Sequence, residues 1–253
     1  AVYVGSTKIW EAGSSWTDPD IANASYDSVS LSVGSVDTSP VGLAFNNDGT
    51  KFYFLGQQNK KVYQYSCSTA YDLSTATKDT EEASVSSQVS GARGFNFNND
   101  GTKFFVSCFT NDAIYEYDLS TAFDVSTASY SNTSLSVTVG SNGSHCMSSD
   151  GLYIYFIDEA DDIDSYALST AWDLSSATAS GTKNDLVETT ETSPSGMFIS
   201  PDGTKLFISG YSSDVVTQSS LSTAYDITTA SYDAVSFSVA SQDGVPYGLF
   251  FKP

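Results

Sequence analysis

The stretch FNNDGTKFYF, residues 45–54, returns as FNNDGTKFFV at residues 97–106. Two looser copies follow, SSDGLYIYF at residues 148–156 and SPDGTKLFI at residues 200–208. The aspartates of the shared turn lie 52, 50 and 52 residues apart, and they are Asp48, Asp100, Asp150 and Asp202. A constant period in this range is typical of one supersecondary unit repeated along the chain.

A second phrase keeps the same period, because LSTAFDVSTASYSNTSLSV at residues 119–137 is nearly repeated as LSTAYDITTASYDAVSFSV at residues 221–239. Between the phrases lie short apolar or alternating segments, such as KFYFLG at residues 51–56 and KVYQYS at residues 61–66. Period-two alternation of β-branched and aromatic residues predicts strands, and no stretch has a sustained helical period. Each unit is therefore predicted to be a four-stranded antiparallel meander.

Four-stranded units at this spacing predict a β-propeller. The last residues, PYGLFFKP, match PVGLAFNN at residues 40–47, whereas the first residues, AVYVGSTKIWEA, match the second and third strands of a unit. We therefore expect the two ends of the chain to share one blade and to leave no open sheet edge. The predicted fold is all-β, a single five-bladed domain over residues 1–253, with blades at residues 246–253 plus 1–35, 40–86, 91–139, 143–190 and 194–241.

The segment SPDGTKLFISGYSSDVV, residues 200–216, resembles the YVTN type of β-propeller repeat, which occurs in bacterial and archaeal surface proteins and in lactonase-like propellers. STAWDLSSAT, residues 169–178, is similar to repeats in proteins of unknown function from marine phages and bacteria. The resemblance implies propeller architecture over the whole chain. Propellers include lectins, glycosidases, lactonases and scaffolds, so the function has to be argued from particular sites.

Charge and cysteine content narrow the choice of partners. Thirty acidic residues against ten basic ones give a net charge of −20, which disfavours binding to nucleic acid and to anionic membranes. No apolar run reaches the roughly 18 residues that a membrane-spanning helix needs, so we expect no membrane insertion. The three cysteines, Cys67, Cys108 and Cys146, lack metal-type spacing, and we expect buried thiols instead of a disulfide framework.

An aromatic residue followed by aspartate recurs in the long loop of each unit. The four aromatic residues are Tyr71, Phe123, Trp172 and Tyr225. One interpretation is a sugar platform with a carboxylate acceptor in every blade, which would give a multivalent lectin. The simpler interpretation is that the ring fills a gap at the blade rim while the aspartate caps a turn.

A second candidate site follows from a position that varies between units beside one that stays apolar. The variable residues, which we expect to form a ring at one mouth of the channel and to bind a ligand there, are Val41, Arg93, His145, Ser195 and Tyr247. The alternative is drift at a solvated rim. His145 is the only histidine of the chain and Arg93 is its only arginine.

Acidic residues form the third candidate site. Asp37, Glu191 and Asp243 occupy one equivalent position in three neighbouring units, where converging carboxylates would suit Ca²⁺ or acid–base chemistry on a glycoside. Asp161 and Asp164 belong to the acidic run DEADDID, residues 158–164, which is either a Ca²⁺ site or a solvated hairpin turn.

No nucleophile motif, phosphate-binding glycine loop or zinc pattern is present, so no catalytic residue is assigned. We therefore expect a non-enzymatic binding or structural module, extracellular or on a virion surface, with a glycan or a protein as its partner. The alternative is a glycosidase-like or lactonase-like hydrolase that uses the carboxylates at the channel mouth.

Overall fold

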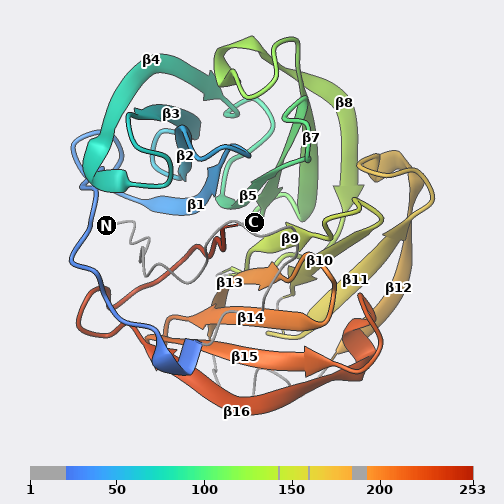
Figure 1. Cartoon of the computed structure of the whole chain (residues 1–253). Coiled ribbons are helices and arrows are strands. Elements are labelled where there is room, and N and C mark those ends of the chain that lie inside the picture. The colour runs from blue at the N-terminus through green and yellow to red at the C-terminus, as the bar shows by residue number, and fades with distance from the viewer. Residues whose placement is uncertain (1–20, 142, 159, 184–192, 253) are drawn as a thin grey trace.

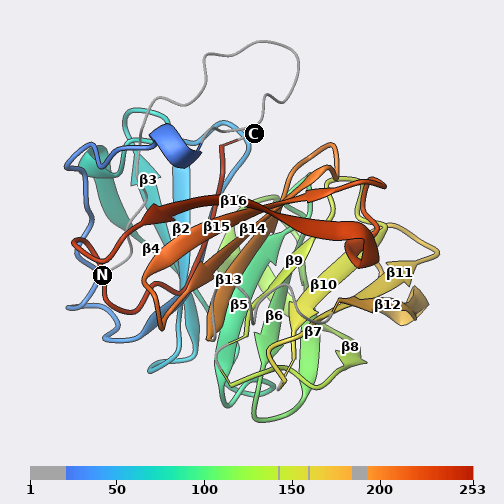
Figure 2. The same cartoon turned by 90° about the horizontal axis from the view of Figure 1, so that it is seen from below.

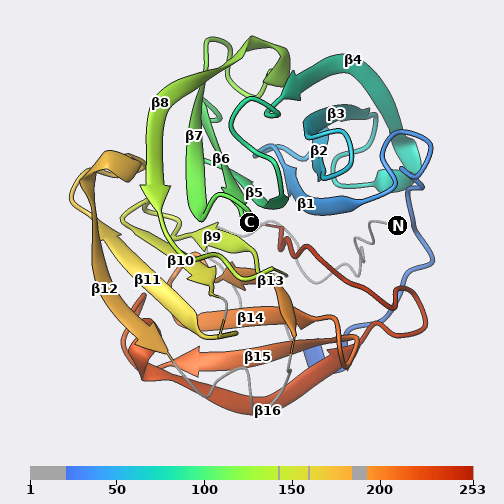
Figure 3. The same cartoon turned by 180° about the vertical axis from the view of Figure 1, so that it is seen from behind.

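The computed structural model describes residues 21–141, 143–158, 160–183 and 193–252. These residues form an all-β propeller of four blades, and each blade is a four-stranded antiparallel sheet (Figure 1). The strands of each blade follow one another in chain order from the axis to the rim. Views from opposite sides place β1, β5, β9 and β13 around the centre and β4, β8, β12 and β16 outermost (Figures 1 and 3).

Blade 1 holds β1 (Pro40–Phe45), β2 (Lys51–Gly56), β3 (Lys61–Cys67) and β4 (Ala76–Ser84). Blade 2 holds β5 (Ala92–Phe97), β6 (Lys103–Cys108), β7 (Ala113–Leu119) and β8 (Ala128–Ser136). Blade 3 holds β9 (His145–Met147), β10 (Tyr153–Ile157), β11 (Ile163–Leu168) and β12 (Ala177–Lys183). Blade 4 holds β13 (Pro194–Ile199), β14 (Lys205–Gly210), β15 (Val215–Leu221) and β16 (Ala230–Ser238). In the view from below, β16 covers the outside of this last blade (Figure 2).

The Asp-Gly turn that defines the repeat joins the first and second strands of every blade. In blade 1, Asp48 accepts a hydrogen bond from the backbone N–H of Thr50 at 2.9 Å, and Gly49 adopts a φ of 71°. Glycine occupies this left-handed conformation without steric cost, which explains why the turn keeps it in all four units.

The long loop of each unit is more ordered than the sequence indicates, and the outer strand begins earlier. Four short 3-10 helices, η2 (Leu73–Thr75), η3 (Val125–Thr127), η4 (Leu174–Ser176) and η5 (Ile227–Thr229), lie directly before the outer strands. Asp72 caps η2 by accepting the N–H of Ser74 at 2.9 Å, and the aspartates of the other three units do the same. The turn-capping interpretation of these aspartates is confirmed.

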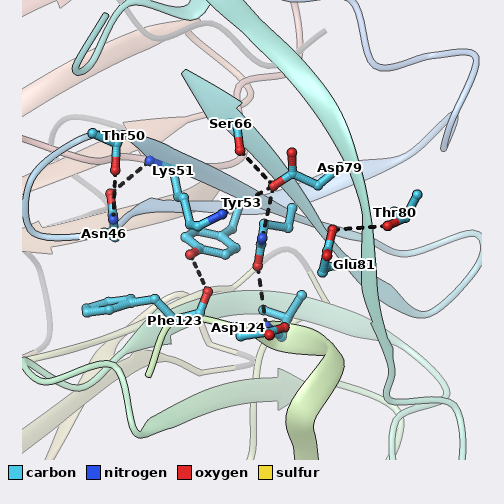
Figure 4. Close-up of polar contacts among 12 residues, drawn as sticks. Asn46, Thr50, Lys51, Tyr53, Ser66, Asp79, Thr80, Glu81, Phe123 and Asp124 are labelled. Atoms are coloured by element: carbon cyan, nitrogen blue, oxygen red, sulfur yellow. Dashed lines mark hydrogen bonds and ion pairs between the residues drawn. The ribbon is translucent and has the colours of Figure 1, made fainter. Parts of the chain in front are cut away.

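Adjacent blades are held together by the 3-10 helix of one blade against the sheet of the blade before it. Tyr53 of blade 1 donates its hydroxyl to the carbonyl of Phe123 at 2.6 Å, and the Gln64 side chain accepts the N–H of Val125 at 3.4 Å (Figure 4). Glu116 of blade 2 accepts the N–H of Leu174 in the same way at 3.2 Å. The buried backbone donors at the start of η3 and η4 thus find side-chain acceptors in the neighbouring blade.

The inner strands approach one another closely at the axis. A Cβ atom on Gly42 of β1 would lie 2.9 Å from the Cβ of Phe95 on β5, which is closer than side chains pack. The same position in β5 is Gly94, and a Cβ there would meet the backbone nitrogen of His145 at 2.8 Å. The glycines therefore let neighbouring backbones come into contact.

The expectation of five blades is wrong for the described residues, which form four. Residues 246–252 contain no strand, and residues 21–35 contain the 3-10 helix η1 (Ile21–Asn23) and no blade strand. The remainder of the expected blade, residues 1–20 and 253, lies outside the described residues. Side-chain packing explains the difference, because these segments fill the interval between blades 4 and 1 without a strand ladder. Ile21 packs with Phe207 and Val216 of blade 4.

The C-terminal segment runs through the same interval toward the centre of the molecule (Figure 1). The ring of Phe250 lies 5.4 Å from that of Phe45 in blade 1, and the ring of Phe251 lies 4.4 Å from that of Phe207 in blade 4. Residues 246–252 therefore join the first and last blades through aromatic contacts.

The three cysteines are free and buried, as expected from their spacing. In the part of the chain that the structure describes, no helix has the length and apolar character needed to cross a membrane.

Candidate functional site

The aromatic residues of the long loops cover the Asp-Gly turns of their own blades. The ring of Phe123 lies over Gly101, where it fills the space that a Cβ would need, and Tyr71, Trp172 and Tyr225 cover Gly49, Gly151 and Gly203 alike. All four aromatic residues adopt a left-handed backbone with φ between 60° and 64°. One face of each ring is thus occupied by the turn, which fits the gap-filling interpretation.

Replacing Asp124 with alanine tests the structural interpretation of these pairs. The change removes the acceptor for the N–H of Ser126, so we expect the free energy of unfolding to fall by about 0.5–2 kcal/mol. Asp124→Asn keeps an acceptor oxygen and serves as the control in urea denaturation. Loss of binding to a glycan array by Asp124→Ala, without loss of stability, would instead favour a sugar site.

Of the five variable positions, the structure brings four together around Tyr247 and its neighbour Pro246. Val41 is buried in the core cluster against which Tyr247 packs, and the guanidinium of Arg93 lies 5.7 Å from the centre of the Tyr247 ring. The Ser195 hydroxyl donates to the carbonyl of Pro246, next to Tyr247. The ring of His145 packs against Gly94, the residue that follows Arg93.

His145 is buried without a partner. Its side chain is 3% exposed, and neither ring nitrogen has a hydrogen bond. Burial away from water lowers the pKa of His145 from 6.5 to about 3, so the ring is neutral at physiological pH. His145 therefore does not lie at a solvent-exposed rim, as the interpretation by random drift assumed.

The three equivalent carboxylates do not form a described site. Asp37 is 2% exposed, and its two oxygens accept the backbone N–H groups of Ser39 and Asn59, each at 2.8 Å. It therefore fixes the loop between β2 and β3 and has little capacity left for a ligand. Glu191 lies outside the described residues. Asp243 is partly exposed, and one of its oxygens accepts the N–H of Val245 at 3.0 Å.

The acidic run in blade 3 is a hairpin turn. Asp158 accepts the N–H groups of Ala160 and Asp162 and so shapes the turn, while Asp164 accepts the hydroxyl of Thr182 on the neighbouring strand. Asp161 lies at the left-handed position of the turn, with a φ of 62°. Among the described residues, no group of three or more His, Cys, Asp or Glu side chains is arranged to hold a metal ion.

A pocket that the sequence does not indicate lies between blades 4 and 1, and we call it the interblade pocket. It has a volume of about 300 Å³, which is the lower end of the range for small-molecule sites. Its walls are residues 38–43 and Gln57 of blade 1, Ser209, Val216 and Val239 of blade 4, and residues 243 and 245–249 of the C-terminal segment. Three chain segments far apart in sequence therefore form one cavity.

Among the described residues that line the interblade pocket, Asp243 is the one carboxylate, and none is basic. The Asp243 oxygen that does not bind Val245 has no hydrogen-bond partner in the described part of the chain. The half-buried side-chain amide of Gln57 also has no hydrogen bond among the described residues. The pocket thus offers one carboxylate as a proton acceptor and one side-chain amide as a donor, beside the hydroxyl groups of Thr38, Ser39, Ser209 and Tyr247.

Comparison with known proteins supports the fold more firmly than the activity. No protein-family model matches the sequence, and a search of curated proteins gives no match. Among solved structures, a "putative 6-phosphogluconolactonase" from Bacteroides uniformis aligns with a TM-score of 0.53 over 79% of this chain, at 14% identity. A protein of the same name from Bacteroides fragilis aligns with a TM-score of 0.50 over 79% of this chain, at 16% identity. This chain spans 55% of the length of each.

A third structure, a functionally unknown protein from Desulfotomaculum acetoxidans, aligns with a TM-score of 0.50 at 10% identity, over 79% of this chain and 70% of its own length. At these identities the likeness shows the β-propeller fold alone. The neighbours that bear a functional name are named as lactonases, not as lectins or virion proteins. The expectation of a non-enzymatic binding module is therefore withdrawn.

Proposed function

We propose that this chain is a lactonase-like hydrolase whose active site is the interblade pocket. The observation that carries the proposal is the position of Asp243, a carboxylate with one unpaired oxygen in the wall of a cavity of about 300 Å³. The YVTN-type repeat and the lactonase names of the Bacteroides structures support the same class of reaction.

The content of the pocket favours a lactone over a glycoside. Glycoside hydrolysis uses two carboxyl groups on opposite sides of the scissile bond, and the described lining of this pocket contains one. Opening a lactone needs a water molecule, a base and a donor for the carbonyl oxygen. In the proposed reaction, Asp243 takes a proton from water as the water oxygen bonds to the carbonyl carbon. The ring C–O bond then breaks, and the proton passes to the leaving oxygen.

Gln57 is the candidate donor to the carbonyl oxygen. Gln57 belongs to blade 1 and lines the same cavity as Asp243. An amide N–H is neutral, so its hydrogen bond strengthens as negative charge develops on the oxygen in the transition state. In the proposed reaction, the Asp243 carboxylate is therefore the base and the Gln57 side-chain amide is the hydrogen-bond donor.

Asp243→Asn tests the proposal directly. We expect kcat for hydrolysis of glucono-δ-lactone to fall about 10²–10⁴-fold, because removing a general base costs that much. The amide keeps an acceptor oxygen for the N–H of Val245, so the melting temperature should not change. The measurement is acid release in a pH-stat above the spontaneous rate.

Asp112→Asn is the matched control for this variant. Asp112 is exposed in the turn before β7 and adopts a left-handed φ of 50°, which asparagine tolerates as well. It removes the same charge from outside the pocket and should leave kcat unchanged. An equal loss of activity in both variants, or none in either, would contradict the role of Asp243.

The charge of the pocket predicts which lactones are accepted. The described lining has one carboxylate and no basic side chain, and the whole chain carries −20. A phosphorylated substrate would be repelled, so we expect glucono-δ-lactone to have a higher kcat/KM than its 6-phosphate. The ratio should fall as NaCl is raised, because salt screens the repulsion. A preference for the phosphorylated lactone would show that a basic group completes the site.

A further inference from the structure

The side chain of Arg93 is buried and has no negatively charged partner among the described residues. It is 8% exposed, and its guanidinium donates through Nε to the carbonyl of Ser141 and through Nη1 to the carbonyl of Ala92 at 3.1 Å. The ion pairs of the described residues are all made by lysines. This is unusual in a chain with thirty acidic residues, where a carboxylate partner is easily found.

A buried charge without a partner destabilises the protein that contains it. Burial lowers the pKa of Arg93, but arginine remains protonated in proteins, so the cost cannot be avoided by losing the proton. Two carbonyl dipoles offset only part of it. The unused N–H groups of this side chain are therefore available to an anion that the described chain itself does not supply.

Two aromatic rings lie near the guanidinium of Arg93, and several of its N–H groups have no acceptor among the described residues. The ring of Phe109 lies 4.3 Å from the central carbon, and the ring of Tyr247 lies 5.7 Å from it. A guanidinium has five N–H groups, of which two are used, so one on Nη1 and both on Nη2 have no acceptor among the described residues. An anion must therefore approach in the plane of the guanidinium.

We propose that Arg93 is a binding site for a small carboxylate anion, held through paired N–H groups between Phe109 and Tyr247. A carboxylate is planar and has two oxygens, so it matches two neighbouring N–H groups in one plane. The flanking rings restrict the thickness of the ligand, which favours a planar anion over a tetrahedral one. The site is separate from the proposed base Asp243 and does not depend on lactone hydrolysis, although Tyr247 lines the interblade pocket as well.

A single arginine makes the test direct. Selective ¹⁵N-arginine labelling gives one side-chain Nε–H signal, that of Arg93. Sodium acetate, sodium phosphate and sodium chloride are titrated separately at constant ionic strength. We expect acetate to shift the signal in a saturable way, while chloride and phosphate leave it nearly unchanged.

Two variants connect the signal to stability. Acetate should raise the melting temperature of the natural chain, because a ligand that binds only the folded state stabilises it. Arg93→Lys keeps the charge but loses the paired N–H groups, and we expect its acetate affinity to fall about tenfold or more. Lys78→Met removes a positive charge at an exposed position and should keep the full acetate response.

The outcomes separate clearly. An equal response to acetate and chloride would overturn the proposal in favour of general screening. A saturable response to phosphate without one to acetate would overturn the assignment to a carboxylate. Full acetate stabilisation in folded Arg93→Lys would place the anion elsewhere. None of these results bears on hydrolysis, which is tested by Asp243→Asn.

Discussion

Deletion of residues 246–253 is expected to abolish cooperative unfolding of the propeller. The ring of Phe251 packs on that of Phe207 at 4.4 Å, and the ring of Phe250 packs on that of Phe45 at 5.4 Å. Fully burying a side chain of this size stabilises a protein by about 1.5–3 kcal/mol, and both of these rings are partly buried. Because the whole fold is worth only about 5–15 kcal/mol, losing both rings and uncovering both partners should remove most of its stability.

Thermal melting followed by circular dichroism checks this expectation. Val245→Ala is the control, since Val245 is exposed at the start of the same segment and its truncation should change stability by less than about 0.5 kcal/mol. Phe250→Ala with Phe251→Ala, made in the full chain, should reproduce most of the effect. A truncated chain that melts like the full one would show that the interval between blades 4 and 1 needs no filling.

Mild acid is expected to destabilise the fold through His145. The unfolded chain binds a proton at this residue below pH 6.5, whereas burial keeps the pKa of the folded residue near 3. Between these values the unfolded state holds more protons, so stability falls as the pH falls, by about 1.4 kcal/mol per pH unit. From pH 6.5 to pH 5 the loss should be about 2 kcal/mol.

The acid effect of the aspartates falls in a lower pH range. A hydrogen bond from the Thr50 hydroxyl holds the pKa of Asp48 below 3.8, and Thr102 does the same for Asp100. Their contribution is present above pH 3.8 and is lost only as the pH falls further. Urea denaturation at pH 6.5 and pH 5 therefore isolates His145.

His145→Leu removes the titrating group and keeps the side chain apolar and of similar size. We expect the variant to lose the destabilisation between pH 6.5 and pH 5, while the change in overall net charge acts on both proteins alike. Equal pH dependence in the two proteins would mean that His145 can bind a proton without leaving its site.

The candidate site could be predicted only in part. Asp243 was identified from its equivalence to Asp37 and Glu191. Equivalence in sequence did not reveal which of these carboxylates already accepts backbone hydrogen bonds through both of its oxygens. Asp37 turns inward to accept the N–H groups of its own loop and of the neighbouring hairpin, whereas Asp243 faces the interblade pocket. The fate of a loop carboxylate depends on which backbone donors lie near it, and sequence spacing does not carry that information.

The number of blades could not be obtained by counting repeats. Residues 21–35 and 246–252 carry the fifth copy of the phrases, yet their described parts form one 3-10 helix and an extended segment. Strands form only where backbone groups of neighbouring segments pair in register. Here the segment is held in place by its side chains, because Phe250 and Phe251 pack against two different blades.

By itself, the sequence determined the repeat, the Asp-Gly turns, the four continuous units of four strands and the burial of the cysteines. These follow from local patterns, since alternation decides which faces are buried and glycine decides where the chain can turn. Only the tertiary structure decided that four blades form, that the interblade pocket opens between the first and the last, and that Arg93 and His145 are buried without charged partners. These depend on contacts between residues far apart in the chain, which no local pattern records.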